Sequence, residues 1–126
     1  MGCSVVRGIR GAITVEQNSA ADILAAAKEL LLTITEVNQV QVEDIASIIF
    51  SVTPDLDAAF PAKAARELGW TSVPLLDLQQ MQVKGALQRC IRVLMHVNTK
   101  LRQTEIKHIY LREAKKLRPD LVEDNT

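Results

Sequence analysis

With 126 residues the chain has room for one domain and one hydrophobic core, and 48% hydrophobic against 24% charged residues is the balance of a globular protein that folds without covalent cross-links. Its 15 lysines and arginines balance 15 aspartates and glutamates, so the chain lacks the net charge that draws a protein to nucleic acid or to a membrane surface. A local basic pocket for a small anion is compatible with that balance.

The first predicted element is a strand over Val5 to Val15. Its sequence, VVRGIRGAITV, is rich in β-branched residues, which favour strands, and it is interrupted by Gly8 and Gly11. A glycine inside a strand indicates a bulge or the close approach of another part of the chain. We therefore expect a strand that is either bulged or closely packed by a neighbour at its glycines.

A long helix is predicted next, over about Ala20 to Asn38. Either Asn18 or Ser19 is expected to cap it, and Asp22 follows three residues after Ser19, where a carboxylate favours the positive end of a helix. The apolar residues that recur at helical spacing are Ile23, Ala27, Leu30, Leu31, Ile34 and Val37. This spacing predicts one apolar face directed at the core.

The rest of the chain predicts four more strands and one short helix. Ile45 to Thr53 is a nearly continuous apolar run, which is typical of a buried strand, and Pro54 ends it. A short helix begins with Pro61 and ends near Gly69. The remaining strands are predicted at Val73 to Leu78, Ile91 to Val97 and Glu105 to Leu111, the last two from strict alternation.

Together these elements predict a single α+β domain over residues 1–126, with about five strands, one long helix on one face and a frayed tail at about 122–126. No apolar run approaches the ~18 residues that a membrane-spanning helix needs. Cys3 and Cys90 form no CxxC or CxxH pattern, so neither a disulfide framework nor a zinc site is expected. Reduced thiols are typical of a cytoplasmic protein.

The residue patterns of the common catalytic classes are missing. The chain has no glycine-rich phosphate loop, no GxSxG elbow and no HExxH. His96 and His108 fall on separate predicted strands, where they are expected to be sheet or surface residues. Cys90 adjoins an apolar strand and has no histidine beside it in the sequence, which predicts a buried, unreactive thiol.

Arginine is the residue type that stands out. Arg10 and Arg92 each lie between apolar or glycine neighbours inside a predicted strand. An arginine in that position either extends to the surface or reaches into a pocket that holds anions, and spacing alone leaves both interpretations open. For Arg7 an exterior salt bridge is expected. Composition and periodicity thus support no more than an α+β domain that offers a site to a multiply anionic small molecule.

Five strings of residues are longer and more unusual than a single motif: VRGIRGAITVE, SVTPDLDAAFPAKAARELGW, VPLLD, CIRVLMHVNT and KHIYLREAKKLRPDL. In this order, from about residue 5 to residue 121, they closely resemble the monofunctional AroH-class chorismate mutases. The resemblance implies an isomerase that converts chorismate into prephenate in phenylalanine and tyrosine biosynthesis, without metal or organic cofactor. It also implies a five-stranded mixed sheet on one long helix plus a short helix, and a homotrimeric pseudo-α/β-barrel with active sites between subunits.

The resemblance assigns site residues by position. Arg10 and Arg92 match the two main arginines that grip the substrate, with Arg92 at the ether oxygen that gains charge in the transition state. Tyr110 matches a residue that helps to hold a substrate carboxylate. The other substrate-binding matches are Phe60, Lys63 and Arg66 in a wall from the adjacent subunit, Ala62, Leu75 and Leu76, and Leu117 and Arg118 in a mobile tail.

One position departs from the family pattern. Gln80 stands where the family usually has a glutamate, whose carboxylate is expected to accept a hydrogen bond from the ring hydroxyl and to offset positive charge that forms on the ring. A glutamine can accept the bond but cannot supply the charge. Our hypothesis is that Asp77, where relatives often carry a small neutral residue, provides the displaced carboxylate, while Gln80 supports the hydroxyl or the ether oxygen. The alternative is that Asp77 only caps the following turn.

Two other functions stay open at this point. A catalytically weak or silent trimer would bind an anionic metabolite as a sensor, which the glutamine at position 80 favours. A different cleft enzyme on a similar trimeric α+β scaffold, such as an enamine/imine deaminase, would explain Arg92 but not Arg10, Tyr110 and Arg118 together. None of these predictions includes a nucleic-acid or membrane partner.

Overall fold

The structure is a computed structural model that describes residues 4–118, so Cys3 and the tail predicted to fray at 122–126 lie outside the described residues. The elements are β1 (Val5–Thr14), α1 (Ala20–Val37), β2 (Ile45–Val52), α2 (Ala62–Glu67), β3 (Leu75–Gln79), β4 (Cys90–Thr99) and β5 (Ile109–Leu111). Short 3₁₀ helices join some of them. Within the described part of the chain no helix has the length and hydropathy to cross a membrane.

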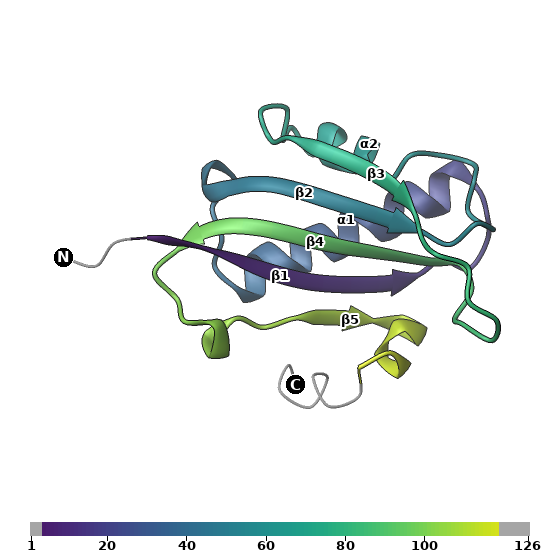
Figure 1. Cartoon of the computed structure of the whole chain (residues 1–126). Coiled ribbons are helices and arrows are strands. Elements are labelled where there is room, and N and C mark those ends of the chain that lie inside the picture. The colour runs from purple at the N-terminus through teal and green to yellow at the C-terminus, as the bar shows by residue number, and fades with distance from the viewer. Residues whose placement is uncertain (1–3, 119–126) are drawn as a thin grey trace.

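The five strands form one mixed sheet in the order β3-β2-β4-β1-β5 (Figure 1). β4 runs antiparallel to both of its neighbours, β1 and β2, while the outer pairs β2–β3 and β1–β5 are parallel. The predicted fold class, a five-stranded mixed sheet with one long and one short helix, is confirmed. The predicted buried strand is β2, which lies inside the sheet between β3 and β4.

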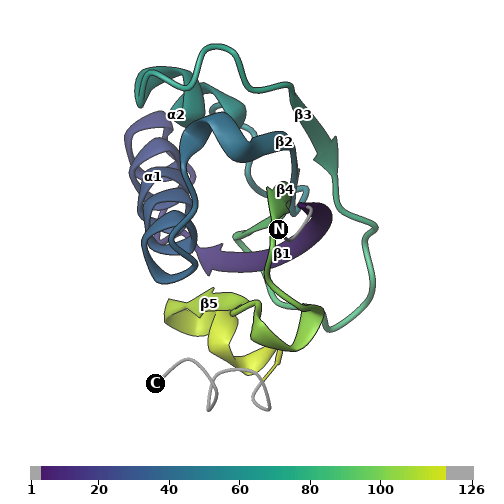
Figure 2. The same cartoon turned by 90° about the vertical axis from the view of Figure 1, so that its left-hand side faces the viewer.

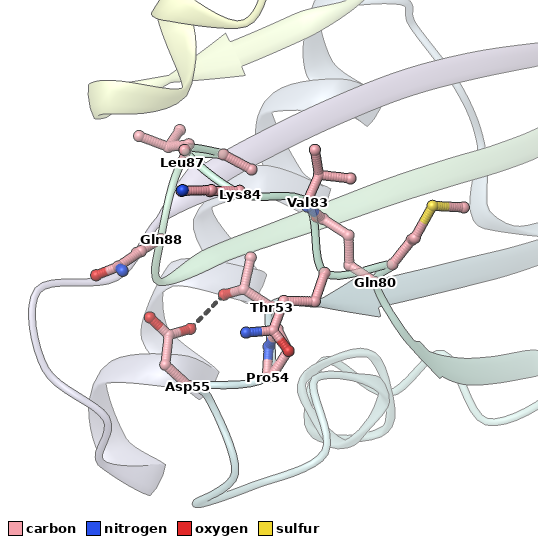
Figure 3. A pocket seen from close by; sticks show the side chains of 12 residues that line it. Thr53, Pro54, Asp55, Gln80, Val83, Lys84, Leu87 and Gln88 are labelled. Atoms are coloured by element: carbon pink, nitrogen blue, oxygen red, sulfur yellow. Dashed lines mark hydrogen bonds between the residues drawn. The ribbon is translucent and has the colours of Figure 1, made fainter.

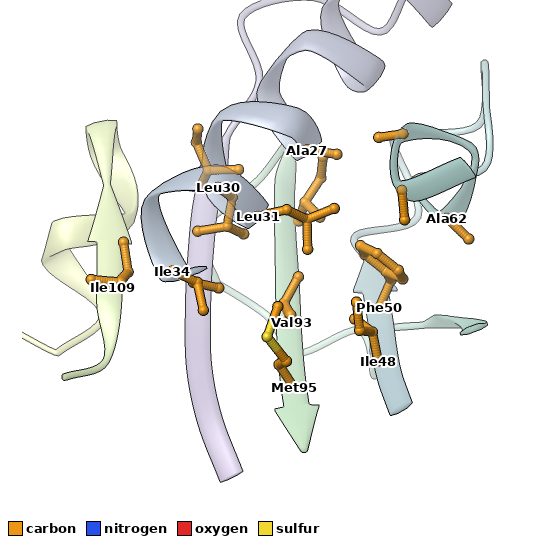
Figure 4. Packing of buried hydrophobic residues seen from close by; sticks show 14 of the residues in the cluster. Ala27, Leu30, Leu31, Ile34, Ile48, Phe50, Ala62, Val93, Met95 and Ile109 are labelled. Atoms are coloured by element: carbon orange, nitrogen blue, oxygen red, sulfur yellow. The ribbon is translucent and has the colours of Figure 1, made fainter. Parts of the chain in front are cut away.

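Both helices cover the same face of the sheet (Figure 2). Leu30, Leu31 and Ile34 of α1 point down onto the strands, where they meet Phe50 and Met95 in a fully buried core (Figure 4). Because side chains alternate along a strand, every second residue from Ile9 to Ile13 in β1 and from Ile91 to Val97 in β4 is directed at this core, and the residues between them lie on the opposite face. We call that second face the open face, since neither helix covers it.

The ends of α1 are fixed by side chains. Ser19 caps its start, as one of the two predicted alternatives, by accepting a hydrogen bond from the Asp22 N–H at 3.1 Å. Asn38 ends the helix, and its side chain bonds both the N–H and the C=O of Lys107 at 2.8 and 2.9 Å. The predicted helix is therefore correct to within one residue at its end.

The last strand is shorter than the alternation of Glu105 to Leu111 predicts, and this prediction is wrong for its first half. The backbone at Gln103–Glu105 forms a 3₁₀ helix, in which the Glu105 carboxylate accepts a bond from the Arg102 N–H at 2.8 Å. Because Asn38 already satisfies both peptide groups of Lys107, that residue does not pair in the sheet. Only Ile109–Leu111 then pairs with β1.

Gly11 explains how α1 approaches β1 so closely. A Cβ at this position would lie 2.8 Å from Ile34 Cδ1 and 3.1 Å from Leu30 Cδ1. The expected close packing on the first strand is thus confirmed, and its neighbour is the long helix.

Candidate active site

The strand register gathers three predicted site residues on the open face. Arg92 of β4 lies opposite Ala12 of β1, and Tyr110 of β5 lies opposite Ala12 from the other side. Arg10 is two residues before Ala12, so it is the diagonal neighbour of Arg92, at about 7–8 Å between backbones. Ala12 is thus a small spacer around which two cations and a phenol are arranged. We call Arg10, Arg92 and Tyr110 the basic group.

His108 connects this group to the end of the described chain. Its Nδ1 accepts a hydrogen bond from the Arg10 N–H at 2.9 Å, which continues the β1–β5 contact with a side chain where the backbone ladder has ended. Burial, together with the guanidinium groups of Arg10 and Arg118, lowers the pKa of His108. Arg118 therefore lies in the same electrostatic neighbourhood as Arg10, and its substrate-binding role stays a prediction.

A small apolar cluster includes Tyr110 of the basic group and adjoins Arg92. It consists of Ala12, Cys90, Tyr110 and Ala114, against which Leu117 is packed. Burial raises the pKa of the Cys90 thiol, although the Arg92 guanidinium beside it acts in the opposite direction. The prediction of a buried thiol is confirmed, and the raised pKa keeps the thiol protonated and unreactive at neutral pH.

The second set of predicted site residues lies at α2. Phe60 is 70% exposed just before this helix, and Lys63 and Arg66 are exposed on it, whereas Ala62 is buried against the core. A pocket of about 460 Å³ lies beside Phe60 and is also lined by Asp77. We call Phe60, Lys63 and Arg66 the α2 wall.

The strand β3 contributes residues to both of its faces. Leu76 is 53% exposed on the open face, whereas Leu75 packs against the core. Asp77 points the same way as Leu75, toward α2, and its Oδ1 accepts a hydrogen bond from the Ala62 N–H at 3.0 Å. Partial burial raises the pKa of Asp77, while the Ala62 N–H and the positive charge of Arg66 act to lower it. The catalytic role of Asp77 stays a prediction.

Gln80 lines a second pocket of about 480 Å³ between β2 and the loop that precedes β4, which shares Thr53 and Pro54 with the pocket beside Phe60 (Figure 3). Its N–H donates to Val52 O at 2.8 Å, which fixes the backbone at this position. Its side-chain Oε1 is buried and has no hydrogen-bond partner within the described residues. A buried oxygen in that state is costly unless a ligand donor reaches it, so Gln80 is suited to accept a hydrogen bond from a hydroxyl group.

A polar clamp holds the far end of this loop. The Thr53 hydroxyl donates to Asp55 at 2.5 Å (Figure 3). It also accepts from the Cys90 N–H at 3.0 Å, and Asp55 accepts from the Arg89 N–H. The clamp fixes the start of β4, two residues before Arg92. Sequence reasoning took the Thr53-Pro54-Asp55 string only as the end of a strand and missed this role, although such residues commonly make local turn bonds.

Within one chain the basic group and the α2 wall are not brought together. The basic group lies on the open face at β4, β1 and β5, while α2 lies beside β3 on the helix-covered face (Figures 1 and 2). Two strand spacings alone separate β4 from β3 by about 10 Å, and the sheet itself stands between the two sets. A small molecule that touches both sets must therefore lie between two chains.

Arg7 does not make the expected exterior salt bridge. Its Nε donates to the backbone carbonyl of Leu101 at 3.0 Å, and the ion pairs described over residues 4–118 involve other residues.

A further residue that sequence reasoning missed is His108, because its bond to Arg10 depends on where β5 begins. Over residues 4–118 no three histidine, cysteine, aspartate or glutamate side chains gather to hold a metal ion.

Known proteins resemble this chain over most of its length. The family model described as chorismate mutase type I matches residues 6–121. Two curated relatives, each named chorismate mutase AroH, are 50% identical (Bacillus subtilis) and 52% identical (Thermus thermophilus) over 118 residues, which is 93% of this chain and 93% and 97% of theirs. A solved chorismate mutase from Clostridium thermocellum has 52% identity and a TM-score of 0.86 over 87% of this chain and 98% of its own.

Proposed function

The chain belongs to the chorismate mutase type I family and is accordingly an isomerase that converts chorismate into prephenate, a step of aromatic amino acid biosynthesis, and we propose that the basic group carries this reaction. The observation that supports this assignment most is the register that arranges Arg10, Arg92 and Tyr110 around Ala12 on the open face.

The proposed role of the basic group is to hold the substrate in its reactive shape. Chorismate is a dianion whose enolpyruvyl side chain must fold over the ring before the [3,3] rearrangement can occur. Arginine binds planar carboxylates with two parallel hydrogen bonds and stays charged at every relevant pH. Arg10 and Tyr110, with Arg118 nearby, would fix the carboxylates and convert a rarely visited conformer into the bound one.

Arg92 is proposed to act on the transition state. As the ether C–O bond breaks and the new C–C bond forms, negative charge gathers on the ether oxygen. A fixed guanidinium at that oxygen stabilises the transition state more than the ground state, which is what raises kcat. No proton is transferred in this step, so the proposed site needs no general base. Gln80, through its unpartnered Oε1, is proposed to accept the hydrogen bond of the ring hydroxyl.

We further propose that the active form is a homotrimer with one site between each pair of neighbours. In it the basic group of one chain would face the α2 wall, with Ala62, Leu75 and Leu76, of the next. The open face supports this assembly because it exposes several apolar side chains, among them Val6 (56%), Leu76 (53%) and Leu78 (47%), that a second chain would cover. Chorismate and prephenate are the proposed ligands, and the cytoplasm is the proposed compartment.

The experiment that tests the function follows the loss of the diene absorbance of chorismate in the presence of the purified protein. Turnover that saturates with chorismate supports the mutase. Saturable binding without turnover would instead favour the sensor, for which the neutral Gln80 is the one specific argument. If the protein neither converts nor binds chorismate, both assignments are contradicted.

A further inference from the structure

We infer that Asp77 is a positioning residue, which holds the start of α2 against β3 and so orients Lys63 and Arg66. The inference rests on the proposed function, in which the α2 wall contacts substrate. It differs from the sequence hypothesis, in which the Asp77 carboxylate itself faces the reacting ring, and from the alternative that Asp77 caps the turn after β3.

The start of α2 needs an acceptor from elsewhere in the chain. The first N–H groups of a helix have no partner inside the helix, and a side chain at the N-cap position usually satisfies one of them. Here the N-cap residue is Pro61, which makes no side-chain capping bond. Asp77, 15 residues further along the chain and on a different element, supplies the missing acceptor to the Ala62 N–H at 3.0 Å.

The charge of Asp77 is also directed at α2. The two groups that support its ionised form against burial are the Ala62 N–H and the positive charge of Arg66, and both belong to this helix. The carboxylate therefore accepts a hydrogen bond from the first N–H of the helix and is stabilised electrostatically by a cation one turn further on. The end of α2 is held by its buried alanines and by the ion pair of Glu67 with Lys28 at 2.8 Å, so the bond from Asp77 is expected to set the position of its first turn.

The placement of Gln80 is consistent with a positioning role for Asp77, because it is Gln80 whose side chain is available to a ligand. The unpartnered oxygen at the end of β3 belongs to Gln80, whereas Asp77 Oδ1 already has its partner. Gln80 can thus accept a hydrogen bond from a ligand hydroxyl, while Asp77, three residues earlier in the sequence, is bonded to the start of α2.

The test compares Asp77→Asn, which keeps an acceptor oxygen but loses the charge, with Asp77→Ala, which loses both. We expect Asp77→Asn to keep kcat/KM for chorismate within about threefold, and Asp77→Ala to lose about tenfold, mainly through a higher KM, because a displaced wall weakens substrate and transition state alike. Asp44→Asn, an exposed aspartate outside the site, is the charge-matched control.

Two outcomes would overturn the inference. If Asp77→Asn loses kcat as severely as Asp77→Ala at unchanged KM, the charge acts on the reacting ring. If both variants keep full activity, the tether has no functional consequence. Circular dichroism melts of both variants show that the comparison is made on folded protein.

A second readout keeps the inference testable even if the unsubstituted protein shows no turnover, which would count against the proposed function instead. Amide hydrogen exchange reports directly on the Ala62 N–H and on the peptide that carries α2. Exchange in α2 is expected to rise about tenfold in Asp77→Ala and to change less than threefold in Asp77→Asn. Equal exchange in all three proteins would contradict the tether.

Discussion

At the scale of single residues, the proposed catalysis depends most on Arg92. Its place on the open face follows from the period of two in β4, and its cross-strand neighbour Ala12 is buried in the small apolar cluster with Tyr110. The residue types could be read from the sequence, but the partners could not, because the register that brings Ala12 between Arg92 and Tyr110 depends on which strands pair.

Replacing Arg92 by alanine tests the proposed transition-state contact. We expect kcat/KM to fall by about 10²–10³, the loss typical when a preorganised donor at a developing oxyanion is removed. Lys100→Ala, which removes an exposed cation just beyond the other end of β4, is the control and should change kcat/KM less than twofold. Steady-state kinetics with chorismate gives kcat/KM for both variants. An equal effect of the two substitutions would exclude a specific role for Arg92.

Gln80→Glu tests whether the site lacks a carboxylate near the ring. The substitution keeps the hydrogen-bond acceptor and adds the negative charge that would offset the positive charge on the ring, so kcat should rise about tenfold, or ~1.4 kcal/mol of barrier. The matched change Gln41→Glu adds the same charge on an exposed side chain that does not line this pocket. A decrease of kcat in Gln80→Glu, with Gln41→Glu unchanged, would show that the amide itself is needed.

At the scale of elements, the strand β5 shows what a pattern of alternation cannot decide. The sequence from Glu105 to Leu111 alternates as a strand should, yet its first half is held by the Glu105 carboxylate and by Asn38. The other elements could be predicted to within two or three residues, because their caps, prolines and apolar periods are local signals. The Asp77–Ala62 contact and the bond from Arg10 to His108 join residues that are far apart in the sequence, so no local motif predicts them.

Gly11→Ala tests the close contact between α1 and β1. A methyl group would meet Ile34 Cδ1 at 2.8 Å in a fully buried place, so we expect the free energy of unfolding to fall by about 1–3 kcal/mol, as overpacking usually costs. Gly8→Ala is the matched change in the same strand, where the nearest atom is Leu94 Cδ1 at 3.3 Å on the open face, and it should cost less. Urea denaturation measures both, and equal losses would argue against the packing explanation.

His108 predicts a pH dependence of stability. Its pKa in the folded chain is lowered by burial and by Arg10 and Arg118, so between that value and the ordinary value near 6.5 the unfolded chain binds a proton that the folded chain does not. Stability should therefore fall as the pH falls through this window. His108→Asn keeps an acceptor for the Arg10 N–H but does not titrate, so its Tm should decrease less between pH 7.5 and 5.5. An identical decrease in both proteins would contradict the role of His108.

At the scale of the whole molecule, one chain presents two separate sets of proposed ligand contacts. The basic group lies on the open face at β4, β1 and β5, and the α2 wall lies beside β3 on the covered face. The exposed apolar residues of the open face lie on β1 (Val6) and on β3 (Leu76 and Leu78). In the proposed homotrimer a closed ring of chains would join the two sets at every interface, because each chain would offer one set to each neighbour.

The most direct test of this arrangement mixes two variants, Arg92→Ala, which damages the basic group, and the double variant Lys63→Ala/Arg66→Ala, which damages the α2 wall. Each is expected to be nearly inactive on chorismate alone. If sites form between chains, unfolding equal amounts of the two together and refolding them as a mixture gives sites in which both sets are intact, about one quarter of all sites for random assembly. Recovery to about one quarter of the original activity is the predicted result. Activity no higher than that of the two variants measured separately would show that each site belongs to a single chain.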